Sequence, residues 1–211
     1  PLALAMPLLL ELAKHNEVQF KFSGTVGGGT PILNFAKKCL YGDKILAIRG
    51  ILNGTTNYIL TEMEKGKEFQ EALREAQVKG YAEADPSLDI DGIDSACKLV
   101  ILSNWILGKR VTLKDVKIKG IRDIRRKDLE EANKKGKTIK LIASVNGDIK
   151  VEPEEIDKDS HLAIPGSLNA VSFISQYAGE ETIIGRGAGG KETASSIIRD
   201  LIEIKMYFTE R

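Results

Sequence analysis

The chain has 211 residues, a length that can form one or two domains with a buried core. Hydrophobic residues make up 42%, charged residues make up 29%, and the formal net charge is only +1. This mixed charge gives no footprint for nucleic acid or for a membrane surface. Cys39 and Cys97 lie in apolar stretches and fit free thiols of a cytoplasmic protein, since two cysteines make no disulfide framework.

The N-terminal segment 1–16 is apolar enough to resemble a signal peptide. No basic segment precedes it, however, and Glu11 and Lys14 interrupt the apolar run. Its apolar residues fall on one helical face, which favours an amphipathic helix. No run in the sequence is long enough to span a membrane. The chain starts on Pro1 rather than Met, so we expect it to be part of a longer protein.

Apolar periodicity and turn residues predict the remaining elements. In chain order, with the first helix included, these are a helix at 2–15, a strand at 18–24, a glycine loop at 26–30, a helix at 31–40, a strand at 44–52, helices at 54–65 and 67–79, a loop at 80–90, a helix at 91–107, a short strand at 115–121, a charged helix at 126–135, strands at 137–146, 148–153, 169–177 and 181–184, and a helix at 190–207. Helices come mostly first and strands late, which predicts an α+β fold. We expect one mixed β-sheet, built from the strands at 44–52, 137–146, 148–153 and 169–177, with helices covering one face.

The segment 81–102 concentrates carboxylates ahead of an apolar run that contains a single lysine, Lys98. On a helix over 91–107, the side chains of Asp91, Asp94 and Lys98 share one stripe. One interpretation is an N-terminal cap and an exposed ion pair, worth roughly 0.3–0.5 kcal/mol. The other is a cleft in which carboxylates hold an ammonium group charged or tune it for proton transfer. The preceding acidic turn favours the second interpretation, because a ligand's ammonium group could bind there.

This segment resembles the homoserine dehydrogenases. The family pattern GYxExDPxxDxxGxDxxxK is matched at Gly80, Tyr81, Glu83, Asp85, Pro86, Asp89, Gly92, Asp94 and Lys98. The segments 24–32, 48–60 and 185–201 are also similar to the family's glycine loop, strand-to-helix turn and C-terminal glycine-rich helix start. The resemblance covers nearly all of the chain.

The resemblance implies NAD(P)-dependent interconversion of L-homoserine and L-aspartate 4-semialdehyde, a step of threonine and methionine biosynthesis. It places Lys98 and Asp94 in the catalytic set. The substrate-binding residues that it implies are Glu83, Asp89, Tyr81, Gly54 and Thr55, with Glu83 and Asp89 holding the amino and hydroxyl ends. It also implies a homodimer built on the sheet, and the fold of the second domain of a Rossmann-type dehydrogenase.

The glycine loop at 26–30 has two interpretations. It can be plain backbone punctuation before a helix. By the resemblance, the backbone carbonyls of Val26, Gly28 and Thr30 would bind sodium beside a glutamate. This chain has Ser23 at the glutamate position, so we expect weak sodium occupancy at most.

The other glycine-rich turns also allow more than one role. Thr55 or Thr56 of "NGTTN" can cap a helix as well as contact substrate. The turn "GRGAGG" at 185–190 opens a helix whose free N–H groups suit a phosphate. It is not a Rossmann fingerprint, because no βαβ unit follows it. By the resemblance, Gly187, Gly189 and Gly190 would lie beside the cofactor.

The domain organisation is also implied by the resemblance. We expect a catalytic and dimerisation domain at 1–184, and a turn and helix at 185–211 that complete a nucleotide-binding domain. The rest of that domain, with a second lysine, would precede Pro1. The chain alone is then expected to be inactive. The alternatives are a fragment that binds substrate without turnover, and another aldehyde or hydroxy-acid dehydrogenase with a similar second domain.

Overall fold

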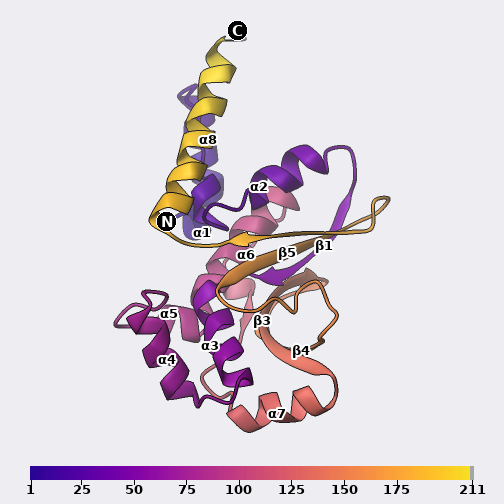
Figure 1. Cartoon of the computed structure of the whole chain (residues 1–211). Helices are drawn as coiled ribbons and strands as arrows, with labels where there is room; N and C mark the ends of the chain where they lie inside the picture. The colour runs from indigo at the N-terminus through magenta and orange to yellow at the C-terminus, as the bar shows by residue number, and fades with distance from the viewer. Residues whose placement is uncertain (210–211) are drawn as a thin grey trace.

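The computed structural model describes residues 1–209, and its centre is a six-stranded sheet with the strand order β2-β4-β3-β1-β5-β6 (Figure 1). All neighbouring strands are antiparallel except β2 and β4, which are parallel. The predicted α+β fold with a mixed sheet is therefore confirmed. The strands are β1 (Ile45–Ile51), β2 (Lys117–Ile118), β3 (Lys137–Asn146), β4 (Asp148–Asp157), β5 (Leu168–Ser175) and β6 (Glu180–Arg186).

The helices mostly precede the long strands in the chain, as predicted. They are α1 (Leu2–His15), α2 (Ile32–Asn34) with the π-helical turn η2 (Phe35–Cys39), α3 (Gly54–Glu64), α4 (Phe69–Val78), α5 (Ser87–Ile90), α6 (Ile93–Ile106), α7 (Arg126–Lys134) and α8 (Gly190–Thr209). Short 3-10 turns lie at Ser23–Thr25 and Leu113–Asp115. None of the helices within residues 1–209 is both long and apolar enough to cross a bilayer.

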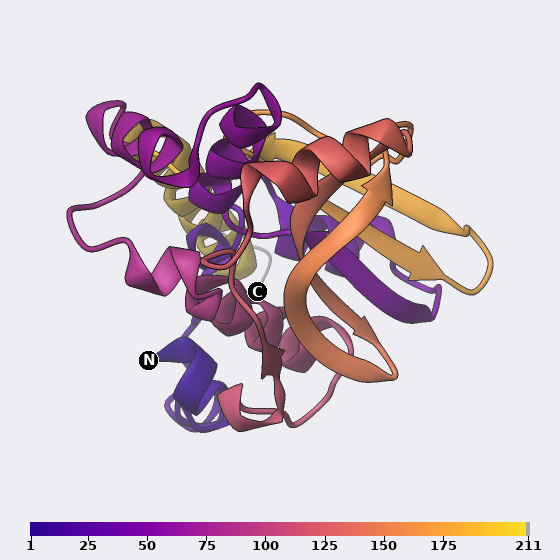
Figure 2. The same ribbon diagram turned by 90° about the horizontal axis from the view of Figure 1, so that it is seen from below.

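One face of the sheet carries the main core. Ile48 of β1, Leu141 of β3 and Phe173 of β5 point to this face and pack into one cluster with Leu99 of α6 and Ile59 of α3. All five side chains are at most 2% exposed. Figure 2 shows the helices gathered beside the curved sheet, with α6 between the sheet and α1. The period-two alternation of the strands thus directs their apolar residues onto the helices.

The opposite face is only partly covered. Ile51, Ile142 and Ala170 form a smaller cluster there with Leu162 from the 158–167 connection. Across the rest of this face, the ladder places Arg49 of β1 opposite serines on β3 and β5. Arg49 also forms a salt bridge with Glu154 of β4. This face therefore has a polar centre and little helical cover.

The predicted strand at 18–24 is wrong. Residues 18–22 belong to no helix and pair with no strand, and Ser23–Thr25 form a 3-10 turn. The reason is that Phe22 packs edge-on against Trp105 of α6, with ring centroids 5.0 Å apart, while Val18 stays 55% exposed. The alternating apolar residues of this segment therefore do not indicate a strand, because Phe22 packs against helix α6.

The predicted loop at 80–90 and helix at 91–107 also need correction. The short helix α5 lies within the loop, and α6 begins only at Ile93. Gly92 separates the two helices with φ of 82°, a left-handed conformation that glycine adopts readily. Asp91 therefore lies outside α6, does not cap it, and does not share a helical stripe with Asp94.

Strand β4 is longer than predicted, since it continues through Pro153 to Asp157. Proline cannot donate a ladder hydrogen bond, so it is tolerated only where one edge is open. The parallel neighbour β2 pairs with Lys150 and Val151 alone, which leaves Pro153 at an open edge. The short strand predicted at 115–121 and the strand predicted at 181–184 correspond to β2 and β6.

Helix α8 is fixed to the N-terminal half of the chain by its polar side. Asp200 accepts hydrogen bonds from the backbone N–H of Ser23 at 2.9 Å and from its hydroxyl at 2.5 Å. Glu203 accepts from Asn34 at 2.9 Å and binds Lys38 at 2.6 Å. In Figure 1, α8 rises above the sheet.

The first prediction concerns the main core. Phe173→Ala should lower the free energy of unfolding by about 3–5 kcal/mol, because it removes a fully buried ring and leaves a cavity. The matched control is Leu46→Ala on β1, where the side chain is 52% exposed; it should change stability by less than about 1 kcal/mol. Urea unfolding measures both, and equal losses would contradict the assignment of the core face.

Candidate active site

A cavity of about 880 Å³ opens where the end of β1, the start of α3, the segment 79–98 and the turn 186–192 meet. The sequence analysis placed these segments in one site, although they are far apart in the chain. The cavity lining includes all the residues predicted for catalysis and substrate binding, which are Gly54, Thr55, Tyr81, Glu83, Asp89, Asp94 and Lys98.

The junction of β1 and α3 forms the floor of this site. Asn53 is the N-cap of α3, and its side-chain oxygen accepts from the backbone N–H of Thr56 at 2.9 Å. The cap is thus Asn53, and not Thr55 or Thr56 as the sequence suggested. The carbonyl of Leu52, one residue earlier, accepts from Lys98 Nζ at 3.0 Å and from Asn169 Nδ2 at 3.1 Å. One strand end therefore anchors both a lysine and a buried amide.

Lys98 is held from two sides. Its ammonium lies 2.7 Å from Asp94 Oδ2, one helical turn earlier, and donates to the Leu52 carbonyl. The side chains of Lys98 and Asp94 are 18% and 30% exposed, so the pair is half-buried at the cavity wall. An ammonium group has three N–H donors, and these two partners fix its position. The predicted ion pair between Asp94 and Lys98 is therefore present in the structure.

The amide of Asn53 connects the acidic side chains. Its Nδ2 donates to Asp89 Oδ1 at 2.7 Å and to Asp94 Oδ2 at 2.8 Å. One amide thus holds two carboxylates on one wall of the cavity, and Asp94 in turn binds Lys98. From the sequence, Asn53 was expected only as part of a turn, and this role was missed. Its signal was the N-cap position directly after a buried strand.

Asp89 has a perturbed acidity. Burial raises the pKa of its carboxyl above the ordinary value, the hydrogen bond from Asn53 lowers it, and the negative charge of Asp94 raises it again. The net direction is upward. A cationic ligand beside this carboxyl would favour its ionised form.

The other acids of the 83–91 segment differ in role. Glu83 is exposed and lines the cavity. Asp85 caps its own turn, because its Oδ1 accepts from the hydroxyl of Ser87 at 2.6 Å. Asp91 forms a two-pronged pair with Arg122 at 2.9 and 3.0 Å. Asp91 therefore has a basic partner and is not part of the cavity lining.

Gly54, Thr55 and Tyr81 shape the wall beside the acids. A side chain at Gly54 would bring its Cβ to 2.5 Å from the Ser167 carbonyl, so only glycine fits this approach. The Thr55 hydroxyl donates to the Tyr81 carbonyl at 2.6 Å and so ties α3 to the acidic segment. The ring of Tyr81 is 44% exposed and tilts against Tyr58. These residues position backbone segments around the cavity.

The glycine-rich turn closes the opposite side of the cavity. Gly187 and Gly189 line it, whereas Gly190 begins α8 and is not part of the lining. The carboxylate of Glu192 lies in the first turn of α8 and pairs with Arg186 at 3.0 Å. The hydrogen bond from Arg186 lowers the pKa of Glu192, and a hydrogen bond from the backbone of Glu192 itself lowers it further. Because this helix start already holds a negative charge, it is less suited to a phosphate than the sequence suggested.

The loop at 26–30 does not fit a resident sodium ion well. The carbonyl of Gly28 accepts from Ser196 Oγ at 2.5 Å, and the carbonyl of Gly29 accepts from Arg199 at 3.1 Å. Ser23 binds Asp200 instead of offering a ligand. A guanidinium group beside the loop would repel a cation. Side chains of α8 thus hold the turn that contains Val26, Gly28 and Thr30 through the carbonyls of Gly28 and Gly29.

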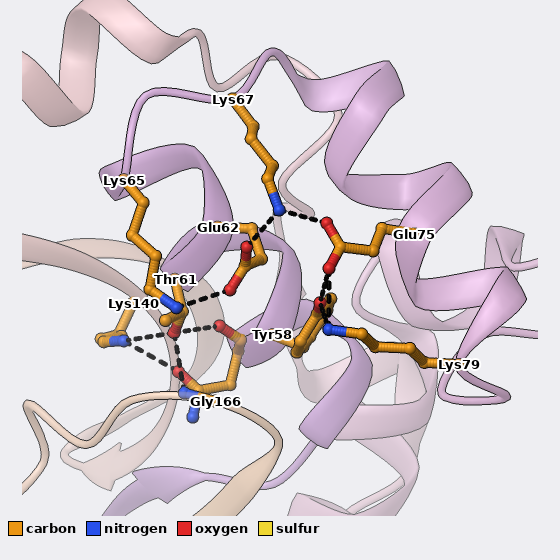
Figure 3. Close-up of polar contacts among 10 residues, drawn as sticks. Tyr58, Thr61, Glu62, Lys65, Lys67, Glu75, Lys79, Lys140 and Gly166 are labelled. Atoms are coloured by element: carbon orange, nitrogen blue, oxygen red, sulfur yellow. Dashed lines mark hydrogen bonds and ion pairs between the residues drawn. The ribbon is translucent and has the colours of Figure 1, made fainter.

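A chain of charged groups extends from Lys79, at the edge of the cavity, to Glu62 (Figure 3). Lys79 lines the cavity, and its ammonium binds Glu75 at 2.7 Å and the Tyr58 hydroxyl at 2.8 Å. Lys67 bridges Glu75 and Glu62 in the same figure. Hydrogen bonds from Lys67, Lys79 and Tyr58 lower the pKa of Glu75. The sequence analysis did not single out Lys79.

An acid-lined cavity with a fixed lysine, set beside a glycine-rich turn, defines a ligand site on an α+β domain. The comparisons then give the family. The family model for homoserine dehydrogenase matches residues 31–202. The chain is 52% identical over 206 residues to homoserine dehydrogenase of Methanocaldococcus jannaschii, covering 97% of this chain and 61% of that protein. The chain belongs to the homoserine dehydrogenase family.

Further relatives agree. An NAD(+)-dependent homoserine dehydrogenase of Pseudomonas canavaninivorans is 43% identical over 218 residues, with 100% of this chain and 62% of that protein covered. The crystal structure of a putative homoserine dehydrogenase from Archaeoglobus fulgidus superposes with a TM-score of 0.93 at 44% identity, covering 97% of this chain and 64% of that one. The chain thus spans less than two thirds of these relatives.

The second prediction concerns the amide that joins the carboxylates. Asn53→Asp should raise the pKa of Asp89 further, because a third carboxylate replaces an N–H donor while the acceptor that caps α3 is kept. Titration of the side-chain carboxyl groups by NMR measures this. Asn53→Ser is the control, since it retains a capping oxygen but adds no charge. An unchanged Asp89 pKa in Asn53→Asp would show that the amide does not govern this carboxyl.

Proposed function

We propose that the chain is the substrate-binding and catalytic portion of an enzyme that interconverts L-homoserine and L-aspartate 4-semialdehyde with NAD or NADP. The observation that carries the proposal is the Lys98–Asp94 pair, fixed to the Leu52 carbonyl and facing the cavity that Asp89 and Glu83 line. Both substrates are small amino acids, whose ammonium group is a cation and whose reacting oxygen is neutral.

The acids receive the ammonium group in this proposal. Asp89 accepts a hydrogen bond from Asn53, and burial raises the pKa of its carboxyl. A bound ammonium favours its charged form, so the ligand supplies the missing counter-charge. Glu83 reaches the same cavity from the exposed side. The substrate then binds by charge pairing at one end, which leaves its other end toward Lys98.

Lys98 acts on the reacting oxygen. When bound, the nicotinamide cofactor supplies or accepts the hydride. Two partners hold the ammonium of Lys98, which leaves its third N–H for the substrate oxygen. In the reductive direction this oxygen gains negative charge, and a nearby ammonium stabilises the charge and can donate the proton. Asp94 orients the lysine and keeps it charged.

The turn at 187–190 is proposed to contact the cofactor. Gly187 and Gly189 line the same cavity as Lys98, and its volume of about 880 Å³ exceeds the needs of a small amino acid. Because Glu192 occupies the start of α8, we assign the turn to the nicotinamide end and not to a phosphate. A hyperthermophilic archaeal homoserine dehydrogenase mutant, solved in complex with NADPH, superposes with a TM-score of 0.86 at 34% identity, covering 98% of this chain and 62% of that one. No step is assigned to sodium.

A further domain is proposed to pack against α1 and α8. The outward sides of both helices carry large apolar residues that are about half exposed or more, which include Leu4, Leu8, Ile197, Ile198, Leu201 and Ile202. Exposed apolar patches of this kind mark contact surfaces, and the relatives are longer than this chain. In this view residues 1–184 form the catalytic and dimerisation domain, and 185–211 complete the nucleotide-binding domain. An NADPH oxidation assay with aspartate 4-semialdehyde, on the chain alone and on a longer protein, tests the division; turnover by the chain alone would contradict it.

The competing proposal is a binding module that takes homoserine without turnover. The chain alone could act in this way, because its cavity contains the acids and the lysine. Homoserine binding without NADPH oxidation in the longer protein would favour the module.

The third prediction tests Lys98. In the complete enzyme, Lys98→Ala should lower kcat by roughly 10²–10⁴, the usual size of a general acid–base contribution. Asp94→Asn should cost less, because its role is orientation, and Glu83→Ala should mainly raise KM for the amino-acid substrate. Steady-state kinetics in both directions measure all three.

Folding is the control for this series, because removing one member of a half-buried pair can itself destabilise the protein by several kcal/mol. Circular dichroism and thermal unfolding should therefore show a folded Lys98→Ala variant. Near-normal kcat in such a folded variant would make Lys98 a structural residue.

We also propose a homodimer that uses the sheet. The face with Ile51 and Ala170 is only partly covered by the 158–167 connection. Ile184 lies opposite Ala170 on this face, belongs to the edge strand β6, and is 47% exposed. An open edge and an uncovered face are features that association can protect.

The fourth prediction is that the chain sediments as a dimer at micromolar concentration, and that Ile184→Lys shifts it to monomer by placing a charge in the contact. Val78→Lys is the matched control, because Val78 is 88% exposed at the end of α4, and it should stay dimeric. A monomeric unmodified chain would refute the proposal.

A further inference from the structure

Lys140 is a buried lysine that the proposed mechanism does not use. It lies in the middle of β3 and is 2% exposed. Its ammonium donates to Asn57 Oδ1 at 2.9 Å and lies 3.4 Å from the Thr61 hydroxyl, and both partners are uncharged side chains of α3. A buried ammonium with neutral partners carries a desolvation cost that apolar residues would avoid.

The two partners connect Lys140 to one wall of the cavity. Asn57 Nδ2 donates to the Leu168 carbonyl at 3.0 Å, and the backbone N–H of Gly166 donates to the Thr61 hydroxyl at 3.0 Å. Figure 3 shows Lys140 pointing to Thr61, with Gly166 reaching the same hydroxyl. The segment between these contacts, 166–168, contributes Ser167 and Leu168 to the cavity lining.

The segment 166–169 also contacts the junction of β1 and α3, which forms the floor of the site. The Ser167 carbonyl lies so close to Gly54 that a Cβ there would come within 2.5 Å. Asn169, the next residue after Leu168, donates to the Leu52 carbonyl, which is also the partner of Lys98. A shift of 166–169 would therefore move both the cavity wall and the acceptor that holds Lys98.

The charged groups around Lys140 are engaged elsewhere. Glu64 of α3 accepts from the Thr138 hydroxyl at 3.0 Å and pairs with Lys158 at 3.2 Å. Glu154 of β4 is opposite Lys140 in the ladder but pairs with Arg49 and Lys150. The 158–167 connection carries Lys158 and two further titratable groups, Asp159 and His161. The ammonium of Lys140 thus acts mainly through hydrogen bonds.

We propose that Lys140 is a positioning residue of the homoserine site: through Asn57 and Thr61 its ammonium group holds the 166–168 wall in place, and substrate affinity falls when this group loses its proton. The inference rests on the proposed function. It adds a residue remote from the reacting atoms and gives the site a sensitivity to alkaline pH. Burial of this charge lowers the stability of the fold, and in return its hydrogen bonds fix the cavity wall.

The pH window follows from the direction of the shift. Burial lowers the pKa of Lys140 from 10.5 to about 8, with Glu64 opposing the change. Between these two values the unfolded chain binds more protons than the folded chain, so the free energy of unfolding rises with pH. Substrate affinity should change in the opposite direction, because a neutral amine forms weaker hydrogen bonds to Asn57 and Thr61 than an ammonium group does.

The test compares Lys140→Met with the unmodified chain. Calorimetry with L-homoserine should show roughly 3- to 10-fold weaker binding in the variant at neutral pH, the fold-change of about one lost hydrogen bond. Affinity of the unmodified chain should fall from about pH 7 to about pH 9, and this limb should be absent in Lys140→Met. The melting temperature of the variant at pH 7 should be equal or higher, since a buried charge is gone.

Lys137→Met is the matched control, because Lys137 begins the same strand with its side chain 38% exposed; it should retain affinity and the alkaline limb. A readout without substrate is hydrogen exchange of the Gly166 amide, which should quicken in Lys140→Met relative to the control. Unchanged exchange and an unchanged alkaline limb would overturn the role of Lys140. Absence of homoserine binding by every variant, with Gly166 exchange altered as expected, would instead refute the proposed substrate.

Discussion

The carbonyl of Leu52, at the end of β1, is the contact on which the rest of the site depends. It accepts from Lys98 on α6 and from Asn169 on β5, so three elements meet at one oxygen atom. Asn53 follows immediately, caps α3 and binds two carboxylates. The central strand thus ends in two residues that together fix the lysine, the acids and the helix start. Backbone and amide groups thus hold the lysine and the acids in place.

The electrostatics of the cavity follow from this arrangement. Asp89 is held where burial and Asp94 make its ionisation costly, while Asp94 is compensated by Lys98. Asp94 is therefore already paired with a cation, whereas a cationic ligand would favour the ionised form of Asp89. The buried ammonium of Lys140, behind the opposite wall, is held by neutral groups alone. Lys98 is thus paired with a carboxylate, Asp89 with an amide, and Lys140 with two uncharged side chains.

The sequence predicted those parts of the site that depend on local spacing. Asp94 and Lys98 are four residues apart on a helix, and this spacing brought them together as expected. Asp91 failed the same rule because Gly92 adopts a left-handed conformation and ends the preceding turn. The strand at 18–24 failed because Phe22 packs on Trp105, a contact between distant segments. The links of Lys140 to Asn57 and of Asn169 to Leu52 span more than eighty residues each, and no periodicity in the sequence encodes them.

The central position of β1 has a consequence for the folding of the chain. Its partners β3 and β5 lie far along the sequence, with Gly50 opposite Ala143 and Val171. Closing such long loops costs chain entropy before any contact is gained, and proteins built on non-local pairing fold slowly. The Leu52 carbonyl can receive Asn169 only after β5 has docked beside β1. The helices α3 and α6 can form early from local contacts, whereas the binding cavity is completed only when the last third of the chain has joined the sheet.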